Sequence, residues 1–184
     1  MREPAPPYRN EGPHALWHVS EDPSLSLFEP HVAATAAERE RLVWAIDTRH
    51  LPLYWFPRDC PRGTFWARSG SDPEDVRRLL GGGARVHAVE EAWLPRLRAA
   101  QLFAYRLPER PFEPHPEVGG YWIAREAVEA VERVPLRDPV ELHREAGIEL
   151  LALPSLWPLW NEVVASTLEY SGIRLRNATP MLSS

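Results

Sequence analysis

Lysine is absent from this sequence of 184 residues, and cysteine is nearly so. All 21 basic residues are arginines, and Cys60 is the one cysteine. A single cysteine excludes an internal disulfide and any zinc site built on cysteine pairs. The net charge of −5 argues against a general nucleic-acid-binding surface, although Arg174 and Arg176 can form a local basic patch near the C-terminus.

Long apolar runs are also lacking. No stretch approaches the roughly 18 residues that a membrane-spanning helix needs. The N-terminal stretch MREPAPPYRNEG has no apolar segment of the kind found in signal peptides. We therefore expect a cytoplasmic protein without a membrane partner.

Several catalytic and phosphate-binding motifs are missing as well. The chain contains no GxxxxGK phosphate loop, no GxSxG nucleophile elbow and no HExxH metal motif. The glycines at 81–83 follow a predicted helix, so they are expected to end that helix and not to bind an anion. We predict no metal site and no required cofactor.

Proline and tryptophan are the abundant residues. The chain has 20 prolines, which interrupt regular structure, and 8 tryptophans, which supply bulky packing surface. The length fits one domain with a sizeable core. We predict a flexible tail at residues 1–13, a single domain at residues 14–178 and a C-terminal tail at residues 179–184. The oligomeric state does not follow from the sequence.

Short strands and short helices are predicted in mixed order. Alternating or continuous apolar residues predict strands in LWHVS, LVWAI, GTFWA, ARVHAVE, QLFAYRL, GGYWIAR, the second half of EAVEAVERVPL, and IELLALP. Short helices are expected in AATAAERER, TRHLPLYWF and EAWLPRLRA. The stretch SLWPLWNEVVASTLEY predicts a longer helix that begins at Ser155 and ends before Gly172. No strict strand–helix alternation is visible, which favours an α+β fold with a mostly antiparallel, possibly split sheet.

Two segments carry matching helix-start signals. In DPEDVRRLLGGG, Asp72 is the expected N-cap and Pro73 the first helical residue; in DPVELHREAG, Asp138 and Pro139 have the same roles. Acidic residues follow each proline, where the helix dipole favours negative charge. Both segments are therefore predicted to be helical.

The stretch WFPRDCPRG places two charged side chains and a thiol between two prolines. Cys60 would be a nucleophile if a base lay nearby, but a lone cysteine is more commonly a small buried apolar residue. Arg58 and Asp59 could bind a ligand carboxylate or phosphate, or pair with other parts of the fold. We predict a rigid corner leading into a strand, with Arg58 or Asp59 anchoring it through hydrogen bonds and Cys60 buried.

Histidine and glutamate supply the other candidate site residues. His18 and Ser20 lie two residues apart in a strand and so share a face, which could form the floor of a ligand site; a His satisfied inside the fold is the alternative. Glu126 follows the strand GGYWIAR, whose glycines allow close approach of a ligand or a second backbone; a charge on an exposed edge is the alternative. The remaining candidates, His50, His87 and His143, have no partners at metal-ligand spacing, so metal binding is not expected.

The order of these motifs carries a resemblance. LWHVSEDPSLSLFEP, VWAIDTRHLPLYWFPRDCP, ARVHAVEEAWL, GYWIAREAVE and SLWPLWNEVVASTLEYSGIRLRNA together resemble a family of uncharacterised bacterial proteins of about this length. More distantly, an aromatic residue, a His and a hydroxyl residue on a first strand, with a Glu after a late strand, are similar to the ADP-ribosyltransferase superfamily and its RNA phosphotransferase relatives.

The distant resemblance implies a nucleotide ligand such as NAD, which would be a substrate. It implies that His18 contacts the nicotinamide-side ribose, that Tyr54 or Trp55 stacks on nicotinamide, and that Glu126 supports the reacting ribose. Ser20, which shares a strand face with His18, and Arg58 are further candidates for ligand binding. Ala124 stands where the arginine-modifying members have Gln or Glu, and the Ser-Thr-Ser strand of those members is lacking. The rival hypothesis is a non-catalytic binding or interaction module with a Trp-rich surface.

Overall fold

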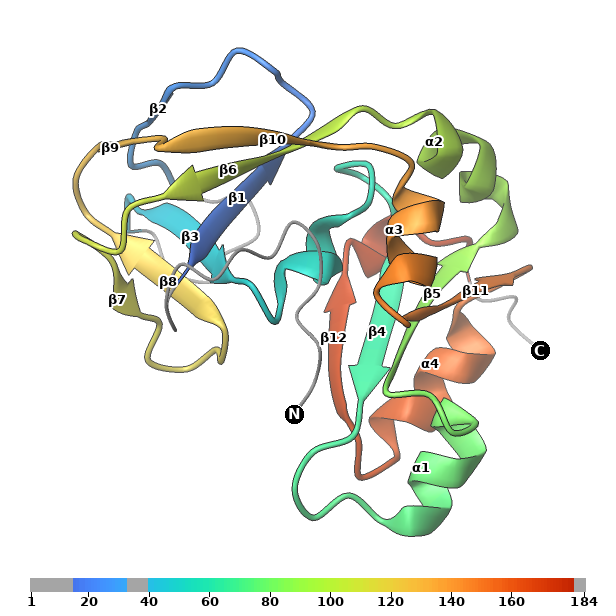
Figure 1. The fold of residues 1–184 in the computed structure, drawn as a ribbon. Helices are drawn as coiled ribbons and strands as arrows, with labels where there is room; N and C mark the ends of the chain where they lie inside the picture. Colours follow the sequence, from blue (N-terminus) through green and yellow to red (C-terminus); the bar gives the residue numbers. More distant parts are fainter. Residues whose placement is uncertain (1–14, 33–39, 181–184) are drawn as a thin grey trace. The chain divides into compact units, whose positions relative to one another are not determined.

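The computed structural model describes residues 15–32 and 40–180 (Figure 1). The chain divides into two compact units. Unit 1 comprises Met1–Trp55 and Gln101–Arg137, and unit 2 comprises Phe56–Ala100 and Asp138–Ser184. The two predicted tails fall almost wholly outside the described residues, and the prediction of one domain over residues 14–178 stays a prediction.

Unit 1 is built on a six-stranded antiparallel sheet in the order β10-β6-β1-β3-β8-β7. Its strands are β1 (Leu16–Ser20), β3 (Val43–Asp47), β6 (Leu102–Leu107), β7 (Glu113–Pro114), β8 (Tyr121–Ala124) and β10 (Glu132–Leu136). A short pair, β2 (Leu27–Phe28) with β9 (Val128–Glu129), and one 3-10 turn, η1 (Leu51–Tyr54), complete the unit.

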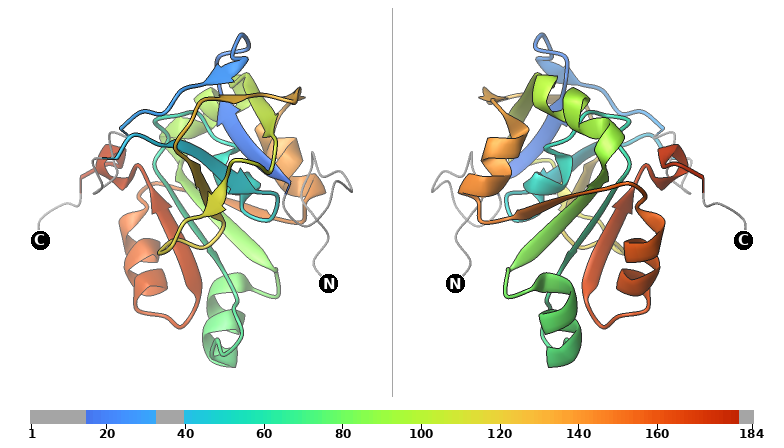
Figure 2. Two further views of the ribbon diagram at one scale, coloured as in Figure 1. Left: turned by 90° about the vertical axis from the view of Figure 1, so that its left-hand side faces the viewer. Right: turned by 90° about the vertical axis from the view of Figure 1, so that its right-hand side faces the viewer.

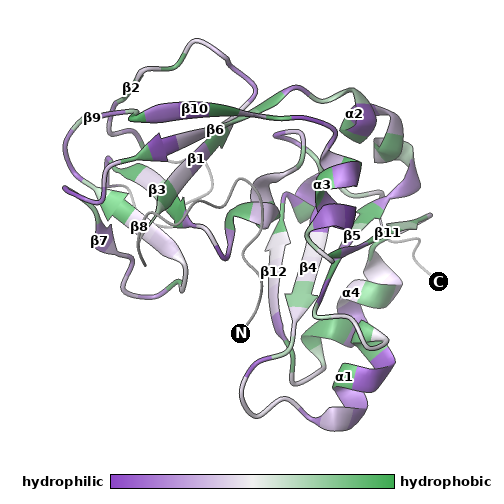
Figure 3. Ribbon diagram, viewed as in Figure 1, coloured by the Kyte–Doolittle hydropathy of each residue, from purple (hydrophilic) through white to green (hydrophobic). Residues whose placement is uncertain are grey.

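One face of this sheet packs on the core of unit 1. Leu16, Ala45 and Tyr105 come from three adjacent strands and pack with Phe28 of β2. Because side chains alternate along a strand, Trp17 and Trp44 belong to the opposite face. Figure 3 shows that these strands contain both hydrophobic and hydrophilic residues.

Unit 2 contains a four-stranded sheet in the order β11-β5-β4-β12, in which only β11 and β5 are parallel. Its strands are β4 (Arg62–Trp66), β5 (Arg85–Glu90), β11 (Glu149–Leu153) and β12 (Glu169–Ile173). The helices are α1 (Pro73–Leu80), α2 (Leu94–Ala99), α3 (Pro139–Glu145) and α4 (Trp157–Val164), with short turns η2 (Glu91–Trp93) and η3 (Leu175–Asn177). The predicted α+β class, with separate and mostly antiparallel sheets and short helices, is confirmed.

The helices of unit 2 cover both faces of its sheet (Figure 2). Phe65 and Val86 pack against α1 and α4, together with Val163. Val89, on the other face, packs with Leu97 of α2 and with Val140 of α3. The second face is unusually polar for a covered surface, since Arg62, Thr64, Arg85 and His87 are all buried on it.

Most predicted elements are present, with one clear exception. The helix predicted from Ser155 to before Gly172 ends at Val164, and residues 169–173 instead form β12. The Ser166 hydroxyl donates a hydrogen bond to the Val163 carbonyl oxygen, which provides a partner for the end of the helix, and β12 then pairs with β4.

The start of this helix also differs from the prediction. Ser155 does accept a hydrogen bond from the Trp157 N–H at 3.4 Å, but the N-cap position is Leu156. The helix predicted in AATAAERER lies mostly outside the described residues.

The two helices predicted from their caps are confirmed. The Asp72 side chain accepts a hydrogen bond from the Glu74 N–H at 2.7 Å, and Gly81 ends α1 in the left-handed conformation with φ of 54°. The Asp138 carboxylate accepts from the Glu141 N–H at 3.2 Å at the start of α3. Local capping chemistry therefore determines where both helices begin.

We expect Asp72→Ala to lower the free energy of unfolding by about 1 kcal/mol, because the Glu74 N–H loses its partner at the helix start. Urea unfolding followed by far-ultraviolet circular dichroism measures this. Asp72→Asn, which keeps a capping oxygen, is the control and should change stability much less. Equal losses in the two variants would contradict a capping role.

Candidate functional site

Unit 1 contains a cavity of about 100 Å³. Its walls carry four large aromatic residues and a histidine. The lining residues are Trp17, His18, Val19, Trp44, Ala45, Ile46, Tyr54 and Tyr121. We call this cavity the aromatic pocket.

The aromatic pocket lies where β1 and β3 separate. Hydrogen-bonded pairing between these strands covers only two residue pairs, Leu16 with Asp47 and Trp17 with Ile46. Beyond them, β1 stays paired with β6 and β3 stays paired with β8. The residues at the point of separation, His18 and Val19 on β1 and Trp44 and Ala45 on β3, all line the pocket.

His18 occupies the gap between the two strands. Its Nδ1 lies 3.0 Å from the Trp44 carbonyl oxygen, and its ring lies 4.9 Å from that of Phe28 in the core. A carbonyl oxygen only accepts, so Nδ1 carries the proton and Nε2 is the basic nitrogen of the neutral ring. The side chain thus has both proposed properties: it is satisfied inside the fold, and it lines a cavity.

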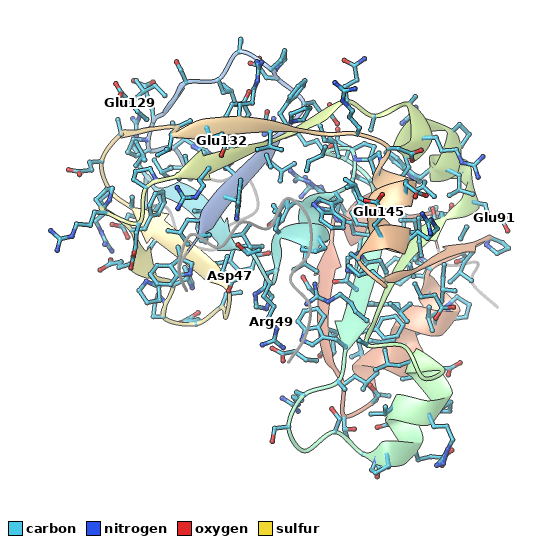
Figure 4. The ribbon with its side chains drawn as sticks, viewed as in Figure 1. Asp47, Arg49, Glu91, Glu129, Glu132 and Glu145 are labelled. Atoms are coloured by element: carbon cyan, nitrogen blue, oxygen red, sulfur yellow. The ribbon has the colours of Figure 1, made fainter. Side chains whose placement is uncertain are left out.

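The 3-10 turn η1 brings Tyr54 to the pocket. Asp47 ends β3 (labelled in Figure 4), and its Oδ1 accepts hydrogen bonds from the backbone N–H and the Nδ1 of His50, at 2.8 and 2.7 Å. The His50 ring packs over Gly120, where an added Cβ would lie 2.2 Å from Nδ1 and where φ is +85°. Only glycine therefore lets η1 approach the start of β8 this closely.

The aromatic rings form a connected row. Trp44 stacks on His115 with ring centroids 5.2 Å apart and meets Tyr121 edge to face at 6.3 Å. Tyr121 meets Tyr54 edge to face at 6.4 Å, and their hydroxyl groups are 2.9 Å apart. These contacts fix the orientation of the rings relative to one another.

The predicted site residues do not all meet. His18 and Tyr54 line the aromatic pocket, whereas Ser20, Trp55 and Glu126 are not among its lining residues. The Ser20 hydroxyl accepts a hydrogen bond from the Asp22 N–H, and Trp55 is fully buried. Arg58 is exposed and belongs to unit 2.

Glu126 lies in the exposed turn between β8 and β9. The strand before it, β8, is separated from β1 by β3. The strand that precedes Glu126 is therefore not adjacent to the strand of His18 in the sheet. Sequence reasoning also missed Trp17, Trp44 and Tyr121 as pocket residues.

Cys60 is a buried structural residue. Burial raises the pKa of its thiol to about 12, and the nearby Arg62 lowers it by less. The Sγ atom donates to the Pro61 carbonyl oxygen at 3.6 Å, a partner that cannot act as a base. A thiol of this kind is not an activated nucleophile.

The stretch around Cys60 forms the predicted corner before β4. Its anchors are backbone groups: the Arg58 carbonyl oxygen accepts from Arg174 Nε at 3.3 Å, and the Asp59 carbonyl oxygen accepts from Asn177 Nδ2 at 2.8 Å. Arg62 donates to the Cys60 carbonyl oxygen at 2.9 Å. These bonds hold the corner against the C-terminal part of unit 2.

The described part of the chain meets neither the requirements of a metal cluster nor those of a membrane-spanning helix. Residues 15–32 and 40–180 contain no group of three or more His, Cys, Asp or Glu side chains that could hold a metal ion. Among the same residues, every helix is too short or too polar to span a bilayer.

Comparison with known proteins places the chain in a family. The profile of DUF6886, a family of unknown function, matches residues 17–178, and the chain belongs to this family. No curated protein and no solved structure matches it. The resemblance to an uncharacterised domain family is thereby confirmed, while the distant resemblance to ADP-ribosyltransferases has no support from these comparisons.

We expect iodoacetamide to alkylate Cys60 at least ~100-fold more slowly in the native protein than in urea, because the thiol is buried and protonated. Mass spectrometry of timed samples at pH 7.5 measures the rate, and the urea-unfolded chain is the reference. Rapid native alkylation would show that Cys60 is an accessible thiolate.

Proposed function

We propose that unit 1 of this member of a family of unknown function is a ligand-binding module that takes a flat, largely apolar group into the aromatic pocket. The observation that carries the proposal is the gathering of Trp17, Trp44, Tyr54 and Tyr121 around one cavity beside His18. Binding pockets in proteins combine an apolar aromatic lining with a few polar groups that orient the ligand.

The size of the pocket limits what enters it. A cavity of about 150 Å³ lined by apolar side chains binds benzene, and the aromatic pocket measures about 100 Å³. One small ring therefore fills it, and the rest of a larger ligand stays outside. A nicotinamide or similar heteroaromatic ring attached to a nucleotide has this form.

The polar groups at the pocket suit such a ring. The His18 imidazole and the paired hydroxyl groups of Tyr54 and Tyr121 are the polar groups at the pocket. Ring stacking contributes about 0.5–1.5 kcal/mol beyond the burial of apolar area. Together these contacts favour a ring that carries an amide or ring nitrogen.

ADP-ribosyl transfer or NAD hydrolysis is the second candidate function. The specific observation in its favour is that His18 and Tyr54, the residues to which the superfamily resemblance assigns ribose and nicotinamide contacts, line one pocket. The reaction also needs a carboxylate beside the ribose, and no Asp or Glu is among the lining residues. Binding without turnover is therefore the better-supported function.

We expect nicotinamide and NAD to quench the intrinsic tryptophan fluorescence and to raise the unfolding temperature. A ligand at 100 times its dissociation constant should add about 2.7 kcal/mol of stability. Tyr54→Leu removes a ring from the pocket and should weaken binding about tenfold. Tyr170→Leu, a substitution of an exposed tyrosine in unit 2, is the matched control and should leave affinity unchanged.

Two further outcomes decide between the candidates. If NAD, ADP-ribose, nicotinamide and indole all leave fluorescence and stability unchanged, the ligand-binding proposal is wrong. If the protein releases nicotinamide from NAD, and Glu126→Gln abolishes release without weakening NAD binding, the enzymatic candidate replaces the binding module.

A further inference from the structure

Unit 2 contains a buried pair of histidines whose side chains bond each other. His87 lies on β5 and His143 on α3, and neither side chain is exposed to solvent. His87 Nδ1 is 2.9 Å from His143 Nε2, and His143 Nδ1 is 2.6 Å from the Pro139 carbonyl oxygen. The two rings therefore form a chain of hydrogen bonds from the sheet to the first turn of α3.

The end of this chain determines every proton position in it. The Pro139 carbonyl oxygen can only accept, so His143 carries its proton on Nδ1 and presents a lone pair at Nε2. His87 must then donate from Nδ1. Its own Nε2 is left as a buried lone pair without a hydrogen-bond partner among the described residues.

The surroundings disfavour a further positive charge. Arg62 on β4 and Arg85 on β5 are both buried, and both act electrostatically on His87. Phe56 packs against both imidazole rings, with centroids 5.7 Å from His87 and 5.0 Å from His143. Cys60 is neutral, and the Glu90 carboxylate is engaged by the N–H and hydroxyl groups of Thr179.

We propose that the His87–His143 pair is an acid-sensitive latch that holds α3 on β5. One added proton binds the buried lone pair at His87 Nε2, which leaves the hydrogen bond from His87 Nδ1 to His143 Nε2 in place but puts a charge beside Arg62 and Arg85. A second added proton places two N–H groups against each other, and the bond between α3 and β5 is lost. Acid therefore detaches α3 from the sheet.

The direction of the pH effect follows from proton linkage. Burial lowers the pKa of His143 from 6.5 to about 4 and lowers the pKa of His87 as well, with further lowering of the latter by His143, Arg85 and Arg62. The full stability is present above pH 6.5 and is lost as pH falls toward 4, because the unfolded chain binds protons that the native chain excludes. Asp22, Asp75 and Glu141, whose pKa values are lowered from 3.8 or 4.5, lose their contributions at lower pH.

The test is the unfolding equilibrium of the full chain between pH 7.5 and 5, measured by urea titration. Two histidines that are neutral when folded and have an ordinary pKa when unfolded should raise the unfolding constant about 1,000-fold over this range. His87→Asn keeps a donor in the place of Nδ1 and should reduce the rise to about 30-fold. The double variant His87→Asn with His143→Gln should nearly abolish it.

His31→Gln is the control, because His31 is an exposed residue of unit 1. It should preserve the 1,000-fold rise. A wild-type unfolding constant that stays flat over this pH range, or a double variant that keeps the wild-type pH dependence, would overturn the latch.

Nitrogen-15 NMR of the wild-type imidazoles at pH 7.5 is independent of whether the variants fold. The latch requires that both His87 and His143 carry their proton on Nδ1. On acidification, the long-range nitrogen–carbon-bound-proton correlations of this tautomer should disappear at a higher pH than that at which the carboxylates titrate. An Nε2–H tautomer at His143 would rule out the hydrogen-bond chain on which the proposal stands.

Discussion

The separation of β1 from β3 is the constraint on which the candidate site depends. Two strands of one sheet that part after two residue pairs leave backbone groups without ladder partners, and such groups are costly when buried. The His18 imidazole supplies a partner by bonding the Trp44 carbonyl oxygen. The same residue therefore stabilises the opening between the strands and forms part of its wall.

Unit 2 stabilises its buried polar side chains through contacts with aromatic rings. Its second sheet face buries two arginines and a histidine, which would be costly without local compensation. Arg62 lies 5.1 Å over the ring of Phe56, and Arg85 lies 5.0 Å over that of Trp66. Aromatic faces thus stabilise cations in one unit, while aromatic edges and faces surround a cavity in the other.

The limits of sequence-based prediction follow from the range of the interactions. The starts of α1 and α3 could be predicted because Asp72 and Asp138 cap helices within their own segments. The apolar pattern predicts a helix over the segment that forms β12. The structure differs because β12 pairs with β4, and this pairing joins residues about a hundred positions apart. Apolar periodicity contains no information about such partners.

The candidate site shows the same division. His18 is a candidate from its residue type and local setting, whereas Tyr54 is a candidate only through the distant resemblance; both line the aromatic pocket. Trp44 and Tyr121 could not be predicted, because their meeting depends on the register of β3 with β8 and on the placement of η1. The sequence shows no nearby partner for His87 or His143, yet they bond each other across 56 positions of sequence.

The chain leaves each unit and returns to it. Unit 1 is interrupted after Trp55 and resumes at Gln101, and unit 2 begins at Phe56 and finishes only with the last segment, from Asp138 onward. During synthesis, β1 emerges long before β6, its full-length partner, and β5 emerges long before β11. Neither unit can be produced by cutting the gene at one point, because any single cut removes strands from at least one sheet. A separate unit would require its two segments to be rejoined by a designed linker.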